Sequence, residues 1–272
     1  MSKWILAVLF LWSYSITQIF AEEEIIGGTA AHPKKFPAAA RLGYRDKARN
    51  QTTWFCGGTL ISKRVVLTAA HCFYTDIGAV NVVRLGELVF NSDKDDAQPE
   101  DFEVLKLKEH PSFNYPALYN DIGLVHLSRD VVFNAYKIPA CLPYTSGQQL
   151  RYFIAIGWGL THATRGQQSK ELRRVDLQNF GVRCAQTTER NEDLPNGFDE
   201  LTQLCVGSPQ HKDTCNGDSG GPLLIRHIGQ GCAYQVLGIT SVGIACDTPG
   251  IPSLYTKVFF YLEWIRSEMN AI

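Results

Sequence analysis

The sequence predicts an all-β fold that ends in one helix. From Ile25 onward, short apolar runs follow one another, and most are bounded by Gly, Pro, Asn or Ser. This pattern is typical of barrels and sandwiches built from short strands. The expected strands include residues 59–61, 65–68, 80–85, 102–107, 153–156, 223–225 and 236–240. At the C-terminus, Val258, Leu262, Ile265 and Met269 recur at helical spacing and define the face that packs on the domain.

Residues 1–21 have the features of a secretory signal peptide. Lys3 precedes an apolar run over residues 4–12, and Ala21 lies directly before an acidic segment, so cleavage after Ala21 is expected. A membrane anchor is the alternative, but this run is much shorter than the ~20 residues that a spanning helix needs. We therefore expect a secreted, extracellular protein with no membrane association.

Two later features bear on the boundaries of the folded part. The acidic residues 22–24 give way abruptly to the apolar residues 25–26. A new N-terminus at Ile25 would be the product of a processing step that removes residues 22–24 as a short propeptide. Residues 91–101 and 187–197 are polar enough to be exposed loops.

The charge balance argues against some classes of partner. The chain has 26 basic and 27 acidic residues, a net charge of −1. A near-neutral chain offers no electrostatic basis for binding nucleic acid or an anionic membrane surface.

The cysteines favour disulfides over metal binding. A secreted chain with eight cysteines is in a compartment where disulfides form and persist. None of the cysteines has the Cys-x-x-Cys spacing of a zinc site. The sequon at Asn50 is a glycosylation candidate in that compartment, although sequons are often unused.

The segment 213–222, which reads DTCNGDSGGP, is the strongest candidate for chemistry. Ser219 lies between glycines, in a pattern that suits a sharp turn with an exposed hydroxyl and free backbone N–H groups beside it. Because a serine hydroxyl is a weak nucleophile, it needs a base from elsewhere in the chain.

His71 and Asp121 are the candidates for the base and its partner. His71 follows an apolar strand and precedes Cys72, which can fix its loop, although such a histidine is more often structural. Asp121 begins another apolar run and can orient an imidazole, although an Asn-Asp pair is commonly a turn. An α/β-hydrolase is the rival enzyme class, but it needs an acid and then a histidine after the serine. No Asp or Glu lies between Ser219 and His227.

These residues belong to a series of motifs that resembles the chymotrypsin-like (trypsin) serine proteases. The matching segments are IIGG at 25–28, CGGTLI at 56–61, TAAHC at 68–72, DIGL at 121–124, GWG at 157–159, DTCNGDSGGP at 213–222 and YTKV at 255–258. The residues around Cys205 and Ser219 look most like insect proteases related to snake and easter. An N-terminal clip domain is usual in that subgroup and is not expected here.

The resemblance implies a fold and a reaction. The fold is two perpendicular six-stranded antiparallel β-barrels in a trypsin-like peptidase domain over residues 25–272, with the site between the barrels. The reaction is peptide hydrolysis through an acyl-enzyme, with Ser219 as nucleophile, His71 as general base and Asp121 as its orienting partner. The backbone N–H groups of Gly217 and Ser219 are the expected oxyanion hole. No cofactor is implied.

The resemblance also implies disulfides and an activation step. It pairs Cys56 with Cys72, Cys184 with Cys205, and Cys215 with Cys246, which leaves Cys141 and Cys232 to pair with each other. The amino group freed at Ile25 is expected to pair with Asp218 and order the oxyanion loop. Because Glu24, and not Lys or Arg, precedes the cut, the activating enzyme is expected to be an acid-specific protease or an exopeptidase.

Substrate preference follows from the same resemblance. Asp213 occupies the position that carries the charge at the base of a trypsin pocket, so cleavage after Arg or Lys is expected. Ser241, Val242 and Gly243 form the expected pocket edge, which pairs with the substrate backbone. Val242 replaces a tryptophan of most relatives, and Ser253 replaces a glycine, so the pocket is expected to be shallower.

Calcium is a weaker expectation. Glu87 matches a calcium ligand of some relatives, and a loop with further carboxylates follows it, at Asp93, Asp95, Asp96, Glu100 and Asp101. An acidic loop is more often simply solvated, so the expected state is metal-free.

The expected partners are protein or peptide substrates, protein protease inhibitors and an activating protease, and the chain is expected to be a monomer. The alternative function is a catalytically silent or zymogen-locked homologue that acts by binding.

Overall fold

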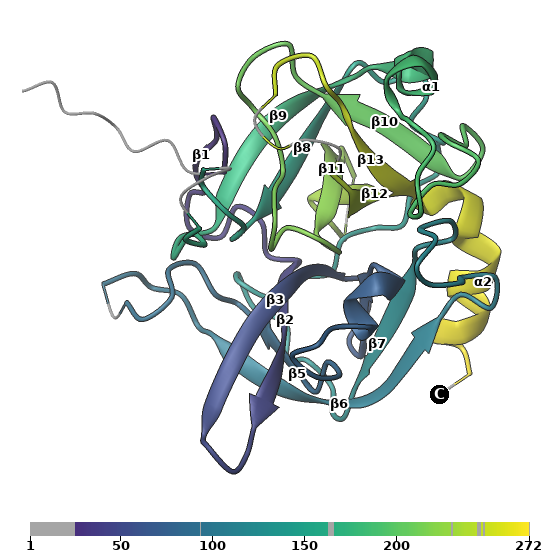
Figure 1. Cartoon of the computed structure of the whole chain (residues 1–272). Coiled ribbons are helices and arrows are strands. Elements are labelled where there is room, and N and C mark those ends of the chain that lie inside the picture. Colours follow the sequence, from purple (N-terminus) through teal and green to yellow (C-terminus); the bar gives the residue numbers. More distant parts are fainter. Residues whose placement is uncertain are drawn as a thin grey trace, which may run out of the picture.

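The computed structural model describes residues 25–92, 94–162, 166–229, 231–243, 246 and 248–271. The predicted signal peptide, the predicted propeptide and Asp93 lie outside these residues. The described chain forms two β-barrels in succession, followed by a helix that runs beside them (Figure 1). Every helix in these ranges is too short or too polar to cross a membrane.

The strands are β1 Thr29–Ala30, β2 Ala39–Asp46, β3 Gln51–Leu60, β4 Val65–Thr68, β5 Val82–Leu85, β6 Glu100–Glu109, β7 Gly123–Leu127, β8 Tyr152–Gly157, β9 Arg173–Asn179, β10 Gln203–Gly207, β11 Pro222–Arg226, β12 Tyr234–Val242 and β13 Ser253–Lys257. The helical segments are η1 Ala70–Phe73, η2 Gly181–Arg183, α1 Cys184–Thr187, η3 Val258–Tyr261 and α2 Leu262–Met269.

Each barrel is a closed antiparallel sheet. The first has the strand order β2-β3-β4-β7-β6-β5, and β2 pairs with β5 to close it. The second has the order β9-β10-β13-β12-β11-β8; β8 pairs with β9 to close it, and β1 adds to β9 from outside. Closure removes the unpaired edges that invite aggregation. The predicted all-β fold of two six-stranded barrels is confirmed.

The barrel interiors explain the short apolar runs in the sequence. In β4 and β7 every residue is buried, so both faces of these strands are covered by other parts of the protein. The predicted helix at the C-terminus is confirmed as η3 and α2. Val258, Tyr261 and Ile265 from these segments join the core cluster that also contains Val66 and Leu124 of the first barrel.

One boundary was wrong. Residues 91–101 were expected to be a loop throughout, but Glu100 and Asp101 begin β6 and pair with β5. Their charges are balanced by cations from neighbouring segments: Lys137 and Arg129 contact Glu100, and Arg84 contacts Asp101. These ion pairs allow acidic residues to occupy a strand.

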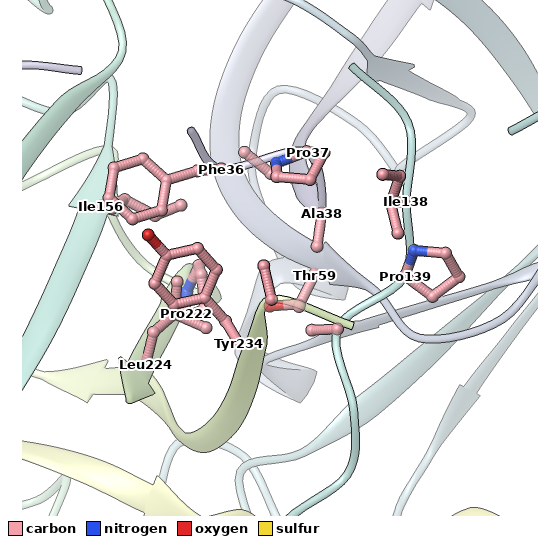
Figure 2. A pocket seen from close by; sticks show the side chains of 13 residues that line it. Phe36, Pro37, Ala38, Thr59, Ile138, Pro139, Ile156, Pro222, Leu224 and Tyr234 are labelled. Atoms are coloured by element: carbon pink, nitrogen blue, oxygen red, sulfur yellow. The ribbon is translucent and has the colours of Figure 1, made fainter. Parts of the chain in front are cut away.

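Residues 128–151 form the inter-barrel connection, which joins β7 to β8. The seam between the barrels is tightly packed on the side where this connection runs. Figure 2 shows a small apolar cavity there, lined by Phe36 and Pro37 before β2, Pro139 of the connection, and Leu224 and Tyr234 of the second barrel. Its volume of about 10 Å³ is room for about one water molecule. The two barrels therefore meet through a continuous apolar contact here.

Four disulfides are present among the described cysteines. They join Cys56 to Cys72, Cys141 to Cys232, Cys184 to Cys205, and Cys215 to Cys246. The Cys141–Cys232 bridge ties the inter-barrel connection to the segment between β11 and β12, beside backbone hydrogen bonds from Cys141 N to Tyr234 O and from Val236 N to Cys141 O.

Candidate active site

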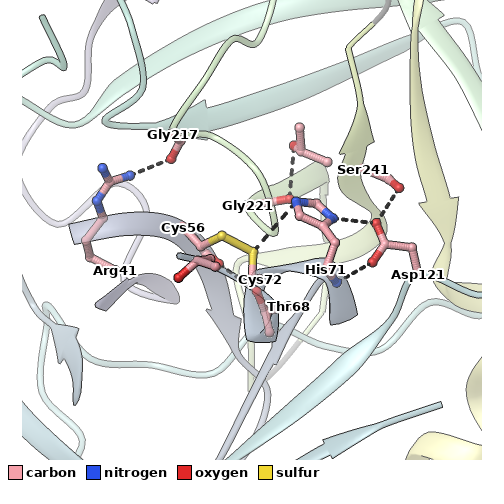
Figure 3. Close-up of a disulfide and its surroundings, with 12 residues drawn as sticks. Arg41, Cys56, Thr68, His71, Cys72, Asp121, Gly217, Gly221 and Ser241 are labelled. Carbon is pink, nitrogen blue, oxygen red and sulfur yellow. Dashed lines mark hydrogen bonds and ion pairs between the residues drawn. A yellow bond between two sulfur atoms is a disulfide. The ribbon is translucent and has the colours of Figure 1, made fainter. Parts of the chain in front are cut away.

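Strand pairing brings His71 and Asp121 together. β4 and β7 are neighbours in the first barrel, and Thr68 pairs with Gly123. His71 follows β4 in η1, and Asp121 precedes β7, so both side chains lie at the same end of the two strands. The Cys56–Cys72 bridge ties η1 to β3, as Figure 3 shows.

The two residues make a directed pair. His71 Nδ1 lies 2.7 Å from Asp121 Oδ2, and His71 N donates to Asp121 Oδ1 at 2.8 Å. Because the carboxylate accepts at Nδ1, the neutral imidazole carries its proton there and leaves Nε2 as the basic nitrogen. This is the tautomer that a general base requires.

Asp121 is completely buried and is held by the second barrel as well. The Ser241 hydroxyl of β12 donates to Asp121 Oδ2, and Thr256 Oγ1 of β13 donates to the Asp121 carbonyl at 2.7 Å. Ser241 was predicted only as part of the pocket edge, and neither contact was predicted. Nothing in the local sequence signals them, because the partners are more than a hundred positions apart.

The two groups shift each other's acidity. Burial alone raises the pKa of the Asp121 carboxyl, but the facing His71 and its hydrogen bonds outweigh burial and lower it. Burial lowers the pKa of His71, and the Asp121 charge outweighs that effect and raises it. The pair therefore favours a charged imidazolium once a proton arrives.

Ser219 lies in a loop that both barrels hold. Gly57 N of the first barrel donates to Ser219 O at 2.7 Å, and Gly220 N donates to Thr240 O of the second barrel at 2.8 Å. Gly220 has φ of 76°, and a Cβ there would lie 2.2 Å from Thr68 Oγ1, so only glycine fits. The Ser219 side chain is partly exposed.

The Ser219 hydroxyl makes no hydrogen bond to His71 within the described chain; the neighbour of His71 Nε2 is Cys72 Sγ, at 3.9 Å. Hydrogen bonds of catalytic groups are often long before substrate binds and shorten in the complex. The structure thus brings His71 and Asp121 into contact and holds the loop of Ser219 beside Thr68 and Ala69, which directly precede η1.

Asp213 and Ser253 meet at the base of the predicted pocket. Both are buried, and the Ser253 hydroxyl donates to Asp213 Oδ1 at 3.0 Å. Thr214, the residue after Asp213, and Tyr255, two residues after Ser253, share a hydrogen bond of 2.8 Å. The serine that replaces the family glycine therefore occupies space beside the carboxylate and also uses one of its oxygens.

The predicted pocket edge, Ser241, Val242 and Gly243, lies at the end of the described range 231–243. Val242 ends β12 and packs in a cluster with Leu254, Cys184, Cys205 and Leu194. Gly243 is exposed, and a Cβ there would meet no atom within 4 Å.

Asp218 is buried below Ser219 and faces the turn after β8. Its Oδ1 accepts from Gly159 N at 2.8 Å and its Oδ2 from Cys215 N at 3.0 Å. Burial is the main cause that raises its pKa to about 6. A Cβ at Gly157 would lie 2.1 Å from Asp218 Oδ1, which explains the first glycine of the GWG motif.

Ile25 is also buried, at 0% exposure, in the core of the second barrel. Asp213 N donates to the carbonyl of the next residue, Ile26, at 3.1 Å. The start of the described chain is thus packed beside Asp213.

Glu87 is engaged without a metal. Its Oε2 lies 3.1 Å from Arg84 Nη1, and its Oε1 accepts from Leu88 N at 3.1 Å. Among the nearby acids within the described ranges, Asp96 bonds Lys34 and Tyr136. Neither of the two groups of three potential metal ligands found among the described residues contains Glu87. The geometry therefore gives the calcium hypothesis no support.

Comparison with known proteins places the chain in a family. A family model described as Trypsin matches residues 25–265. The chain belongs to the trypsin family of serine-type endopeptidases. Trypsin-family relatives include serine protease snk of Drosophila melanogaster, 38% identical over 89% of this chain and 56% of its own length. Phenoloxidase-activating factor 1 of Holotrichia diomphalia is 33% identical over 91% of this chain and 70% of its own length.

A further relative is the proclotting enzyme of Tachypleus tridentatus, which is 38% identical over 79% of this chain and 58% of its own length. The chain therefore spans little more than half of two of these relatives. The predicted likeness to insect proteases of the snake type is confirmed at the level of similarity.

Proposed function

We propose that this protein is a secreted serine endopeptidase that hydrolyses peptide bonds after Arg or Lys. The observation that carries the proposal is the contact between His71 and the buried Asp121, beside the loop of Ser219. Ser219 Oγ attacks the scissile carbonyl while His71 Nε2 takes its proton, and the imidazolium then protonates the leaving amine. Water repeats the sequence on the acyl-enzyme, with His71 as base.

The oxyanion of each tetrahedral intermediate is assigned to the backbone N–H groups of Gly217 and Ser219. Gly217 has a backbone φ of 96°, a conformation that residues other than glycine rarely adopt. Donors fixed before the reaction stabilise the developing charge without reorganising. Held from both barrels, the loop of Ser219 is suited to this role.

Preference for Arg or Lys is assigned to Asp213. Its buried carboxylate offers a charge-assisted hydrogen bond to a guanidinium or ammonium group at the base of the pocket. The Ser253 contact reduces both the space and the free acceptor capacity there, which favours the thinner Lys side chain over Arg.

Activation is assigned to release of the amino group of Ile25. In the unprocessed chain, Asp218 is buried with backbone donors, and a new ammonium group nearby would neutralise its charge. The buried position of Ile25 beside Asp213 is the support for this assignment. The residue before the cut is Glu24, so we assign processing to an acid-specific protease or an exopeptidase.

Secretion is supported by the four disulfides together with the N-terminal signal sequence. Asn50 lies in the exposed turn between β2 and β3, where a glycan meets no obstruction. The relatives named for phenoloxidase activation and clotting make cascade proteins the first class of substrates to test.

The test is covalent labelling of processed protein with a peptidyl phosphonate that carries Arg. A Glu24→Lys precursor allows a trypsin-like protease to release Ile25, and the Ser219→Ala variant is the matched control. We expect one label per molecule at Ser219, none in the control, and hydrolysis of Arg and Lys peptides in a panel varied at that one residue. Correctly processed protein that takes no label would instead be a silent homologue that acts by binding.

A further inference from the structure

Arg41 is a buried cation that the proposed reaction leaves without a role. It lies in β2 of the first barrel and is 1% exposed. Its Nη1 donates to the carbonyl of Gly217 at 2.5 Å, and its Nη2 donates to Gln168 Oε1 at 2.5 Å. Figure 3 shows the guanidinium reaching across to the Gly217 carbonyl.

Burying a guanidinium removes its hydration, and this desolvation free energy must be offset by the contacts that the group makes. Its Nε has no hydrogen-bond partner among the described residues, and burial lowers the pKa of Arg41 to about 10, although attraction to Asp218 opposes the shift. Arg41 therefore remains charged at neutral pH. A strand residue that only fills space between barrels would be apolar, because an apolar side chain of the same size avoids this desolvation.

The contact fixes one particular peptide plane. The Gly217 carbonyl and the Asp218 N–H belong to the same peptide, and Asp218 N donates to Cys215 O at 2.9 Å. With Arg41 on the carbonyl, both polar ends of that peptide are held. This matters at a glycine, because without a Cβ the chain at Gly217 rotates freely between conformations.

The held peptide lies between the two donors assigned to the oxyanion. Gly217 N–H belongs to the preceding peptide, whose Asn216 carbonyl accepts from Leu160 N at 2.8 Å, and Ser219 N–H belongs to the peptide that follows. Holding the middle peptide therefore limits how the two donors can rotate relative to each other. We propose that Arg41 is a positioning residue that holds the oxyanion loop in its working conformation from the first barrel, with Gln168 fixing the guanidinium. The proposal rests on the proposed function and adds a residue outside the catalytic set.

The test uses processed Arg41→Met, which keeps the length of the side chain and removes its charge and donors. Arg45→Met is the matched control: Arg45 lies on the same strand and bonds Asp101 and Thr52, away from the oxyanion loop. Arg41→Lys keeps the charge but loses the planar pair of donors.

Three measurements separate positioning from general damage. The first is kcat and KM for the best Arg or Lys substrate. The second is inhibition by a peptide aldehyde, whose hemiacetal oxygen occupies the oxyanion hole. The third is inhibition by benzamidine, which binds the pocket and does not reach that hole.

We expect kcat of Arg41→Met to fall by about ten- to a hundred-fold, part of the ~10²–10³ that loss of one oxyanion donor costs, with KM nearly unchanged. Aldehyde inhibition weakens by a similar factor, because it reports transition-state binding. Benzamidine inhibition stays within about twofold, and Arg41→Lys lies between Met and wild type. Arg45→Met behaves as wild type.

An unchanged kcat and aldehyde affinity in folded Arg41→Met would overturn the proposal, and so would a parallel loss of benzamidine affinity. If Arg41 variants do not fold, Gln168→Ala replaces them, since Gln168 is exposed and its loss frees only Nη2; aldehyde inhibition equal to wild type then counts against the proposal. A wild-type protein that takes no phosphonate label would defeat the proposed function itself, and the role of Arg41 would fall with it.

Discussion

At the scale of single residues, the His71–Asp121 contact sets the expected pH dependence. Asp121→Asn removes the charge that raises the pKa of His71 and replaces it with an amide that can hold the wrong tautomer. We expect kcat to fall by about 10⁴-fold, the magnitude known for this change in a serine-protease triad. The acidic limb of the kcat/KM profile should also move to lower pH.

The measurement is a pH–rate profile of processed enzyme, and Asp130→Asn is the control because Asp130 pairs with Lys63 and Arg64 on the surface. A limb that stays in place in Asp121→Asn would show that another group titrates there.

In the proposed function, Ser253 modifies the preference that Asp213 sets. Ser253→Gly removes the CH₂OH group and its hydrogen bond to Asp213 Oδ1, so the pocket gains depth and Oδ1 keeps its hydrogen bond from Thr214 N but loses the one from Ser253. We expect the ratio of kcat/KM for Arg over Lys to rise about tenfold, within the ~10–200-fold that one methylene-sized change gives.

Paired peptides that differ only in Arg or Lys give this ratio directly. Ser253→Ala keeps most of the volume and removes only the hydroxyl, so it separates space from hydrogen bonding. A ratio that is the same in wild type and Ser253→Gly would rule out Ser253 as a specificity determinant.

At the scale of elements, the Cys141–Cys232 bridge joins the inter-barrel connection to the second barrel across a separation of 91 residues. Cross-linking so long a loop restricts the unfolded chain by about 4–5 kcal/mol in the chain-entropy model. We expect the Cys141→Ser, Cys232→Ser double variant to lose up to about that much free energy of unfolding. Its kcat should match wild type, because the bridge does not contact the candidate site.

Denaturant unfolding of oxidised wild type and the double variant measures the difference. Stability equal to wild type would mean that the backbone bonds of Cys141 to Tyr234 and Val236 hold the connection without the bridge.

The terminal elements show how short segments depend on their surroundings. α2 has eight residues, too few to be stable alone in water. Ile265 is completely buried in a core cluster with residues of both barrels, and Glu268 lies 3.4 Å from Lys108 of β6 in the first barrel, although the helix follows the second. Its apolar face is therefore stabilised by tertiary packing, and the chain end ties the two barrels together.

At the scale of the whole molecule, the buried charge of Asp218 links processing to stability. Its pKa in the unprocessed fold is about 6, against 3.8 for the ordinary group. A raised folded pKa stabilises the fold fully below pH ~4, and this contribution is lost as pH rises through 6. The shift corresponds to on the order of 3 kcal/mol.

We therefore expect the unprocessed precursor to lose stability between pH 4 and 7 relative to Asp218→Asn, whose amide does not titrate. Urea unfolding at both pH values, in a Ser219→Ala background that prevents self-digestion, gives the comparison. After release of Ile25 the new ammonium group should abolish this loss. Parallel pH profiles of precursor and variant would show that Asp218 is already neutralised before processing.

The sequence by itself determined the fold class and proposed the positions that carry chemistry. Short apolar runs with turn residues between them predict an all-β barrel or sandwich, because each run buries a few side chains and must then reverse. The resemblance to trypsin-like proteases was needed to predict two barrels. The glycines in the GWG motif and around Ser219 could also be read from the sequence. The structure gives the reason at Gly157 and Gly220, where close approach of neighbouring atoms leaves no space for a Cβ.

Only the tertiary structure decided which distant groups meet. The hydroxyl of Ser241 on Asp121, that of Ser253 on Asp213, and the guanidinium of Arg41 on Gly217 each join residues at least 40 positions apart. Local periodicity carries no information about such contacts, because strand order and barrel closure set them. For the same reason, the start of β6 at Glu100 depended on cations from other segments that no local pattern reveals.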